Sequence, residues 1–179
     1  MTTLKSALVA VTAASRGRAA AVHGRGGAIR RVTTCSSSSS IDAEVVETFE
    51  DGVRVFAPSG MQRVLFSECG FGADQHGQDA TKAALRACRN AIEFNSIPSV
   101  RALVPGGYDG MKVHVHLGVP KGATVDAAAV QASFPYGEVL PVVVERGGGL
   151  RTRSWISIPA MEDANDDFLI VVANVSVGY

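Results

Sequence analysis

An alanine-rich stripe between residues 79 and 95 constrains the fold of this chain more than any other feature. Small and apolar residues recur there at intervals of three and four: Ala80, Ala83, Ala84, Ala87, Cys88, Ala91 and Ile92. Charged residues occupy the opposite side of the same segment, so the pattern predicts an amphipathic helix that starts at Asp79 and ends before Pro98. Because alanine side chains are short, we expect this helix to lie close against one face of a sheet.

The segments around this helix predict an α/β fold. Met111 to Val119 alternates apolar and polar residues, which is typical of a strand. A second, shorter helix is expected over Val125 to Ala132. Further strands are expected over residues 53–57, 61–67, 139–145, 152–158 and 168–177, with Pro141 favouring an edge or a bulge. We therefore expect a two-layer α/β domain, in which one mixed sheet carries one long and one short helix on one face.

The first 40 residues have the composition of an organellar transit peptide. They contain no Asp or Glu, many Ala, Ser and Thr, and six basic residues: Lys5, Arg16, Arg18, Arg25, Arg30 and Arg31. The uncharged start and the richness in hydroxyl groups favour import into the chloroplast, and the mitochondrion is the alternative. The expected organisation is a transit peptide over 1–40, a linker or N-terminal extension over 41–60, and a single α/β domain over 61–179.

The charge balance excludes some classes of function. The whole chain has a net charge of zero, but without the six basic residues of the leader, 11 basic residues face 17 acidic ones, a net charge of −6. Such a domain is a poor candidate for nonspecific binding to nucleic acid or membranes. No run of 18 apolar residues occurs, so no membrane span is expected. Cys69 and Cys88 are too few for a disulfide scaffold; Cys88 lies in the apolar stripe, and for Cys69 a reactive and a packing role stay open.

The stretch G-F-G-A-D-Q-H-G, residues 70 to 77, stands between a predicted strand and the long helix. Its glycines permit positive φ and close backbone approach, while Asp74 and His76 supply a carboxylate and an imidazole. A nucleotide-binding loop is disfavoured because the spacing matches neither known fingerprint and because Asp74 and Asp79 would repel phosphate. The stretch is better interpreted as a loop that presents Asp74 and His76, with Gly70, Gly72 and Gly77 as candidate binding residues.

The other two histidines of the expected α/β domain suggest a partner for this loop. His114 and His116 lie on one face of the Met111 to Val119 strand, and if that strand is the parallel neighbour of the 61–67 strand, the loop lies near His116. Candidate catalytic residues are then Asp74, His76 and His116. Three alternatives stay open: a divalent metal site (Zn, Fe, Mn or Ni) with Asp74, His76, His114 and His116 as ligands, metal-free acid–base chemistry, and purely structural roles.

Two further features bear on binding. Tyr108 and Asp109 precede the histidine strand and could line the same cleft. A sheet with helices on one face leaves the other face uncovered, and self-association commonly buries such a face, so we expect a homo-oligomer. The chain is accordingly expected to be an enzyme for a small molecule or, alternatively, a non-catalytic oligomer that binds a metabolite or metal or assists assembly.

The eight-residue motif also resembles a known family. Residues 70 to 77 fit G-x-G-x-D-x-H-G, which is similar to the hallmark of a small conserved-hypothetical family, the Lin family, of bacteria, cyanobacteria and plants. The resemblance runs from about Met61 to Tyr179, and the N-terminal extension is similar to that of plant members. It implies domain limits, but no activity, because none is established for the family.

Overall fold

The computed structural model describes residues 42–94 and 97–179. The predicted transit peptide, residues 1–40, lies outside the described residues and stays a prediction. The fold class is confirmed, because the described chain forms a mixed six-stranded sheet with one long helix and short ones.

The sheet is built around its last strand. Strand β8 (Asp167–Gly178) pairs antiparallel with β3 (Val64–Asp74) on one side and with β4 (Lys112–Val119) on the other. Strands β5 (Glu138–Val139) and β6 (Val143–Arg146) both pair parallel with β4, and β7 (Leu150–Arg153) pairs antiparallel with the first residues of β8. Strand β8 is therefore central, and β3 is an edge strand.

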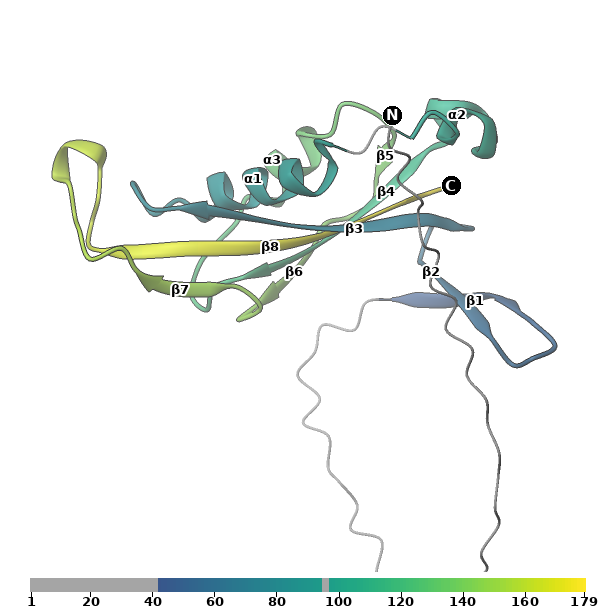
Figure 1. The fold of residues 1–179 in the computed structure, drawn as a ribbon, viewed down its shortest axis with the longest axis horizontal. Coiled ribbons are helices and arrows are strands. Elements are labelled where there is room, and N and C mark those ends of the chain that lie inside the picture. The colour runs from purple at the N-terminus through teal and green to yellow at the C-terminus, as the bar shows by residue number, and fades with distance from the viewer. Residues whose placement is uncertain (1–41, 95–96) are drawn as a thin grey trace, which may run out of the picture. The chain divides into compact units, whose positions relative to one another are not determined.

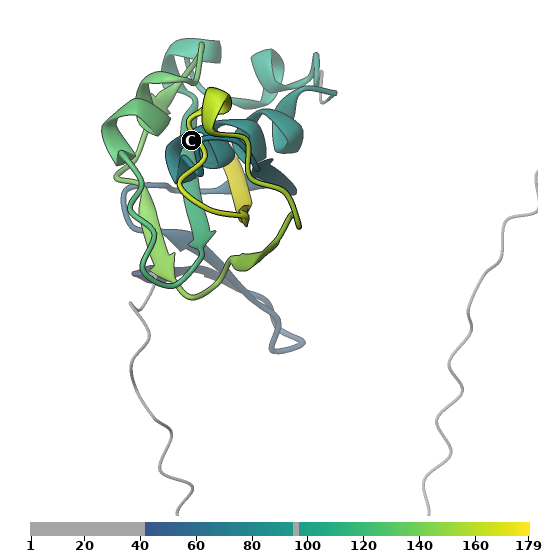
Figure 2. The same ribbon diagram turned by 90° about the vertical axis from the view of Figure 1, so that its left-hand side faces the viewer.

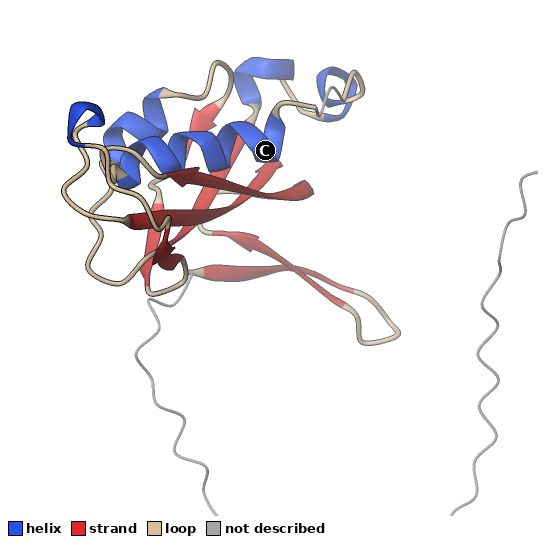
Figure 3. Ribbon diagram, turned by 60° about the vertical axis from the view of Figure 1, so that its left-hand side comes forward, coloured by secondary structure: helices blue, strands red, loops and turns tan. Residues whose placement is uncertain are grey.

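The helices lie on one side of this sheet. Helix α1 (Ala80–Ile92) and helix α3 (Ala127–Ala132) lie above the strands in Figure 1, and Figures 2 and 3 show the same arrangement from two other directions. Helix α2 (Val100–Leu103) and two 3-10 turns, η1 (Gly107–Gly110) and η2 (Pro159–Met161), are short. The expected long and short helix on one face are thus both present.

Helix α1 is held close to the sheet by paired small residues. Its alanines at positions 80, 83, 84, 87 and 91 are buried, as the stripe predicts. Beneath them lie Gly70 and Gly72, which belong to β3 and not to a loop. A Cβ atom on Gly70 would lie 2.4 Å from the Ala87 carbonyl oxygen, and one on Gly72 would lie 2.2 Å from the Ala83 oxygen. The two glycines therefore allow helix and strand backbones to touch.

Both longer helices begin with an aspartate cap. Asp79 accepts hydrogen bonds from the backbone N–H groups of Thr81 and Lys82. Asp126 does the same at the start of α3, with Ala128 and Ala129 as donors. These caps pair N–H groups that a helix start otherwise leaves without partners, which explains the sharp boundaries.

Several expected strands have different limits. The strand expected over 139–145 is split into β5 and β6, with Pro141 between them, because proline cannot donate to the ladder. The strand expected over 152–158 is β7 and ends at Arg153. The largest difference is β3, which continues through the glycine motif to Asp74.

Residues 43–58, where the sequence predicts a linker or extension with one short strand over 53–57, form a hairpin, and the expected strand is its second arm. Strand β1 (Ala43–Thr48) pairs antiparallel with β2 (Arg54–Pro58). The hairpin is joined to the sheet domain by an ion pair of 3.0 Å between Arg63 and Glu47. A small apolar cluster of Ala57, Met61 and Leu140 adds a second contact. Contacts between residues so far apart in the sequence produce no local periodic pattern, so the sequence did not predict them.

The strand order also corrects the expected neighbours. Strands β3 and β4 are parallel to each other, as expected, but β8 lies between them. The sheet face away from α1 carries Cys69, Phe71, His114, His116, Val172 and Asn174, by their registers with one another. We call these six residues the open face.

Candidate functional site

Asp74 is a buried residue that joins β3 to α1. Its side chain is 4% exposed; one carboxylate oxygen accepts the backbone N–H of Asp79 at 2.9 Å, and the other accepts from Arg86 at 2.6 Å. Arg86 also donates to the Ala73 carbonyl. Asp74 therefore holds the start of α1 beside the end of β3. These contacts agree with the structural role that the sequence left open as an alternative.

His76 is held by a residue that the motif does not contain. Its Nδ1 lies 2.9 Å from the Asp163 carboxylate, and the Asp163 side chain is 1% exposed. The same carboxylate accepts the N–H groups of Gly77 and Ile158, at 2.9 and 2.8 Å. With Nδ1 facing a carboxylate, the pairing favours the tautomer that carries its proton on Nδ1 and leaves Nε2 as an acceptor.

These contacts stabilise the charged form of Asp163. The Ile158 N–H above all, and then the His76 ring and the Gly77 N–H, lower the pKa of Asp163 to about 2, against the raising effect of burial. Asp163 is therefore an anion throughout the physiological range and a fixed orienting group for the imidazole.

Gln78 completes the connection between the two loops. Its side-chain amide donates to the Gln75 carbonyl at 2.8 Å, and its oxygen accepts the Ala164 N–H at 3.0 Å. Gly77 and Gln78 both have positive φ, +81° and +46°. Gly77 adopts this region without strain, which explains why the motif ends in glycine.

His76 faces an open depression at the N-terminal end of α1. The depression measures about 650 Å³ and is lined by the end of β3, the first two turns of α1 and the η2 loop. Lys82, Arg86 and Glu162 supply charged groups beside His76 and Asp74. Within the described part of the chain, the Lys82 ammonium has no hydrogen-bond or ion-pair partner. The depression thus combines an oriented imidazole with a free cation and the carboxylate of Glu162.

The structure does not bring His114 and His116 to this depression, which corrects the expected shared site. Asp74 pairs in register with Leu169 and His116 with Asn174, five positions away on β8, roughly 17 Å along the sheet. The two residues also lie on opposite faces, since Asp74 is on the α1 face and His116 on the open face. To be opposite Asp74, His116 would have to pair with the first residues of β8. Those residues pair with β7 instead of β4.

The predicted metal ligands, Asp74, His76, His114 and His116, are not brought together either. Among residues 42–94 and 97–179, no three His, Cys, Asp or Glu side chains are grouped so that they could hold one metal ion. His116 instead has Nε2 buried 3.3 Å from the Glu145 carboxylate, but without hydrogen-bond geometry. Burial, and then the neighbouring His116, lower the pKa of His114, so its ring is neutral at physiological pH.

Most of the remaining candidate binding residues also lie away from the depression beside His76. Tyr108 lines an apolar cavity near the C-terminal end of α1, not the depression beside His76. Asp109 is exposed in η1 and lines neither hollow. Gly70 and Gly72 serve helix packing, and Gly77 donates its N–H to Asp163. Of the predicted residues, therefore, the structure brings together only Asp74 and His76 with the backbone of Gly77.

Comparison with known proteins assigns the chain to a family. The family model described as a conserved hypothetical protein, Lin0512, matches residues 64–177, from β3 to the end of β8. The chain belongs to the Lin0512 family.

A solved structure supports the fold of this Lin0512 protein. The chain is similar to an FtsZ-like protein of unknown function from Nostoc punctiforme PCC 73102, whose crystal structure matches with a TM-score of 0.55 and 37% identity. The match covers 64% of this chain and 93% of the other. A comparison with curated proteins found no match. No helix in the described residues is long and apolar enough to cross a membrane.

Two residues of the site escape sequence reasoning. Asp163 lies in an acidic loop 87 positions from His76, and nothing local distinguishes it from Asp166 or Asp167. Lys82 looks like any solvent-facing helix residue, although the i, i+4 spacing of Lys82 and Arg86 could have shown that both share one helix face. Cys88, by contrast, is buried as expected, and burial raises its thiol pKa to about 11.

Proposed function

We propose that this Lin0512 protein is an enzyme that transfers a proton to or from a small anionic metabolite, with His76 as the general base or acid. The observation that carries the proposal is the His76–Asp163 pair beside the depression that Lys82 and Arg86 line. Histidine is the commonest general acid–base group, and a buried carboxylate that orients the imidazole is a recurring arrangement in such sites.

Each residue then has a distinct role. Asp163 keeps the proton on Nδ1, so that Nε2 accepts a proton from the substrate and later returns it. Lys82, which is free of protein partners in the described residues, binds the anionic group of the substrate. Asp74 acts as a positioning residue, because it holds Arg86 and the start of α1 in place.

The proposal can be tested before the substrate is identified. The full chain is incubated in heavy water with a mixture of small carboxylated and phosphorylated metabolites, and mass spectrometry follows deuterium uptake or conversion. We expect one metabolite to change with the wild-type protein and not with His76→Gln. His116→Gln is the matched control, because it removes an imidazole from the open face and leaves the depression intact.

The same variants separate the proposal from its alternative. A non-catalytic metabolite-binding or assembly protein would change no metabolite, and His76→Gln would then leave the mixture as the wild type does. If His116→Gln also lost activity, the result would support the predicted shared site of Asp74, His76 and His116, with His116 supplied by a second subunit. Lys82→Met should weaken substrate binding and leave the tautomer of His76, measured by 15N NMR, unchanged.

Import into the chloroplast and self-association belong to the same proposal. The acid-free, hydroxyl-rich composition of residues 1–40 supports import, and a fluorescent protein fused behind these residues tests it. The exposed apolar residues of the open face, Phe71 and Val172, support a homo-oligomer. Metal binding is not proposed, because the candidate ligands lie on opposite faces of the sheet.

A further inference from the structure

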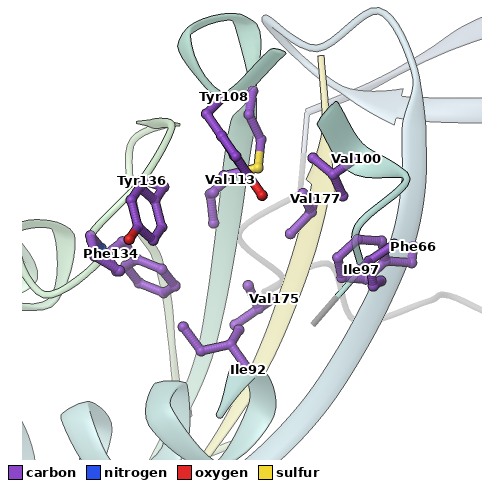
Figure 4. Close-up of a pocket in the computed structure, with 12 residues that line it drawn as sticks. Phe66, Ile92, Ile97, Val100, Tyr108, Val113, Phe134, Tyr136, Val175 and Val177 are labelled. Atoms are coloured by element: carbon purple, nitrogen blue, oxygen red, sulfur yellow. The ribbon is translucent and has the colours of Figure 1, made fainter. Parts of the chain in front are cut away.

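A second hollow lies at the C-terminal end of α1. It has a volume of about 300 Å³ and is lined by twelve residues in or next to β3, α1, α2, η1, β4 and β8 and in the turn after α3. Figure 4 shows its side chains converging on a central space. It shares no lining residue with the depression beside His76. The hollow is therefore independent of the proposed catalytic site.

The lining of this cavity is apolar. None of the twelve residues is charged, and the floor is formed by core residues of the sheet, Val113, Val175 and Val177, which are at most 6% exposed. Phe66 and Phe134 stand on opposite sides of the space in Figure 4. The hollow opens to solvent at Tyr108 and Tyr136, which are 43% and 64% exposed, and its apolar floor and walls favour an apolar occupant.

One polar group points into the space. Tyr108 lies against Tyr136, with ring centroids 5.6 Å apart, and Figure 4 shows the Tyr108 hydroxyl directed between Val113 and Val177. In the described residues this hydroxyl has no hydrogen-bond partner. Convergence of one hydroxyl with an apolar surface is typical of sites that orient a small ligand by a single hydrogen bond.

We propose that this cavity binds a small, uncharged, mainly apolar ring compound that carries one hydrogen-bonding group for the Tyr108 hydroxyl. A 150 Å³ apolar cavity holds benzene, so about 300 Å³ suits a molecule of roughly ten non-hydrogen atoms. A helix of a partner protein, about 10 to 12 Å across, is too wide. A charged ligand would lose its hydration without a counter-charge in the lining.

The probe is 4-ethylphenol, titrated calorimetrically into the full chain, with ethylbenzene and 4-ethylbenzoate as comparisons. We expect 4-ethylphenol to bind with a dissociation constant on the order of 0.1 mM. Tyr108→Phe should weaken it about 5- to 10-fold and leave ethylbenzene binding within about twofold, because only the phenol loses a hydrogen bond. Tyr179→Phe is the matched control, since it removes a tyrosine hydroxyl from a residue that does not line the cavity.

Further variants locate the ligand. Val177→Phe places a ring in the cavity and should abolish binding; if this variant does not fold, Tyr108→Phe with its control still decides the question. Phe71→Ser lies on the open face and should leave binding unchanged. The proposal is overturned if the wild type binds neither neutral probe, if 4-ethylbenzoate binds as well as 4-ethylphenol, or if Phe71→Ser and not Val177→Phe removes binding. His76→Gln should have no effect, so this result is separate from the catalytic one.

Discussion

At the scale of single residues, the glycine motif divides its work between packing and site geometry. Gly70 and Gly72 are two positions apart on a strand and therefore point to the same face, the one that α1 covers. Gly77 is different, because its positive φ and its N–H serve the turn that carries His76. One short motif thus combines a helix-packing surface with a loop that positions an imidazole.

Gly72→Ala should destabilise the fold strongly. The added Cβ would lie 2.2 Å from the Ala83 oxygen and 2.3 Å from the Ala87 nitrogen, both backbone atoms that cannot rotate away. Separation of α1 from β3 is the only relief, and we expect the free energy of unfolding to fall by about 3 kcal/mol or more in urea denaturation.

The matched control is Gly52→Ala. Gly52 has a φ of +86°, but a Cβ atom added there would meet nothing within 4 Å, so only backbone strain of about 1 kcal/mol is expected. Equal losses in the two variants would show that contact with α1 is not what requires glycine at position 72.

At the scale of elements, two aspartates hold the ends of elements together, one between neighbours in the chain and one between distant loops. Asp74 joins the end of β3 to the start of α1, across five residues. Asp163 joins the loop after β3 to the loop before β8, because it accepts from Gly77 and Ile158 as well as from His76. Because the second connection depends on an ionised Asp163, we expect the structure of the candidate site to be sensitive to acid.

The acid stability of the chain should therefore depend on Asp163. Its pKa is about 2 in the folded state against an ordinary value of 3.8, so the folded state favours the carboxylate. The resulting stabilisation is complete above about pH 5 and is lost as the pH falls from about 4 through 2. Urea midpoints measured from pH 6 down to pH 2.5 should fall less steeply for Asp163→Asn than for the wild type.

Asp166→Asn provides the comparison in the same loop. The Asp166 carboxylate pairs with Arg153, which is 62% exposed, so solvent screens the interaction. This variant should keep the steep acid dependence of the wild type. If both variants flatten the curve equally, the loop as a whole and not the His76–Asp163 contact responds to acid.

At the scale of the whole domain, the sheet has one face covered by helices and one that displays apolar side chains. Phe71 is 68% exposed and Val172 is 43% exposed, and the register pairs them directly on neighbouring strands. Exposed apolar residues that adjoin one another on a sheet commonly mark an interface. The expected self-association would bury this pair.

Phe71→Lys should shift the protein to a monomer in sedimentation velocity runs, because the ammonium cannot be buried against an identical surface without a counter-charge. Trp155→Lys is the control, since Trp155 is 84% exposed but lies in the loop after β7. A wild-type protein that is already monomeric at high concentration would contradict the expectation.

The sequence alone determined the elements whose causes are local. Helix α1 follows from its alanine period and its Asp79 cap, and β4 follows from its alternation, since both patterns act within a few residues. From these elements the two-layer fold with helices on one face could be predicted. His76 and Asp74 could be identified because they stand beside glycines in a polar stretch between two regular elements.

Only the tertiary structure decided how these elements meet. The insertion of β8 between β3 and β4 separated Asp74 from His116, and the registers of the two strands on β8 put the two residues on opposite faces; this pairing joins residues up to about a hundred positions apart. The contact between His76 and Asp163 spans 87 positions. Hydrogen bonds between distant strands and loops leave no periodic pattern in the sequence. The sequence therefore revealed Asp74 and His76 as candidate site residues, but it could not reveal which distant residues they contact.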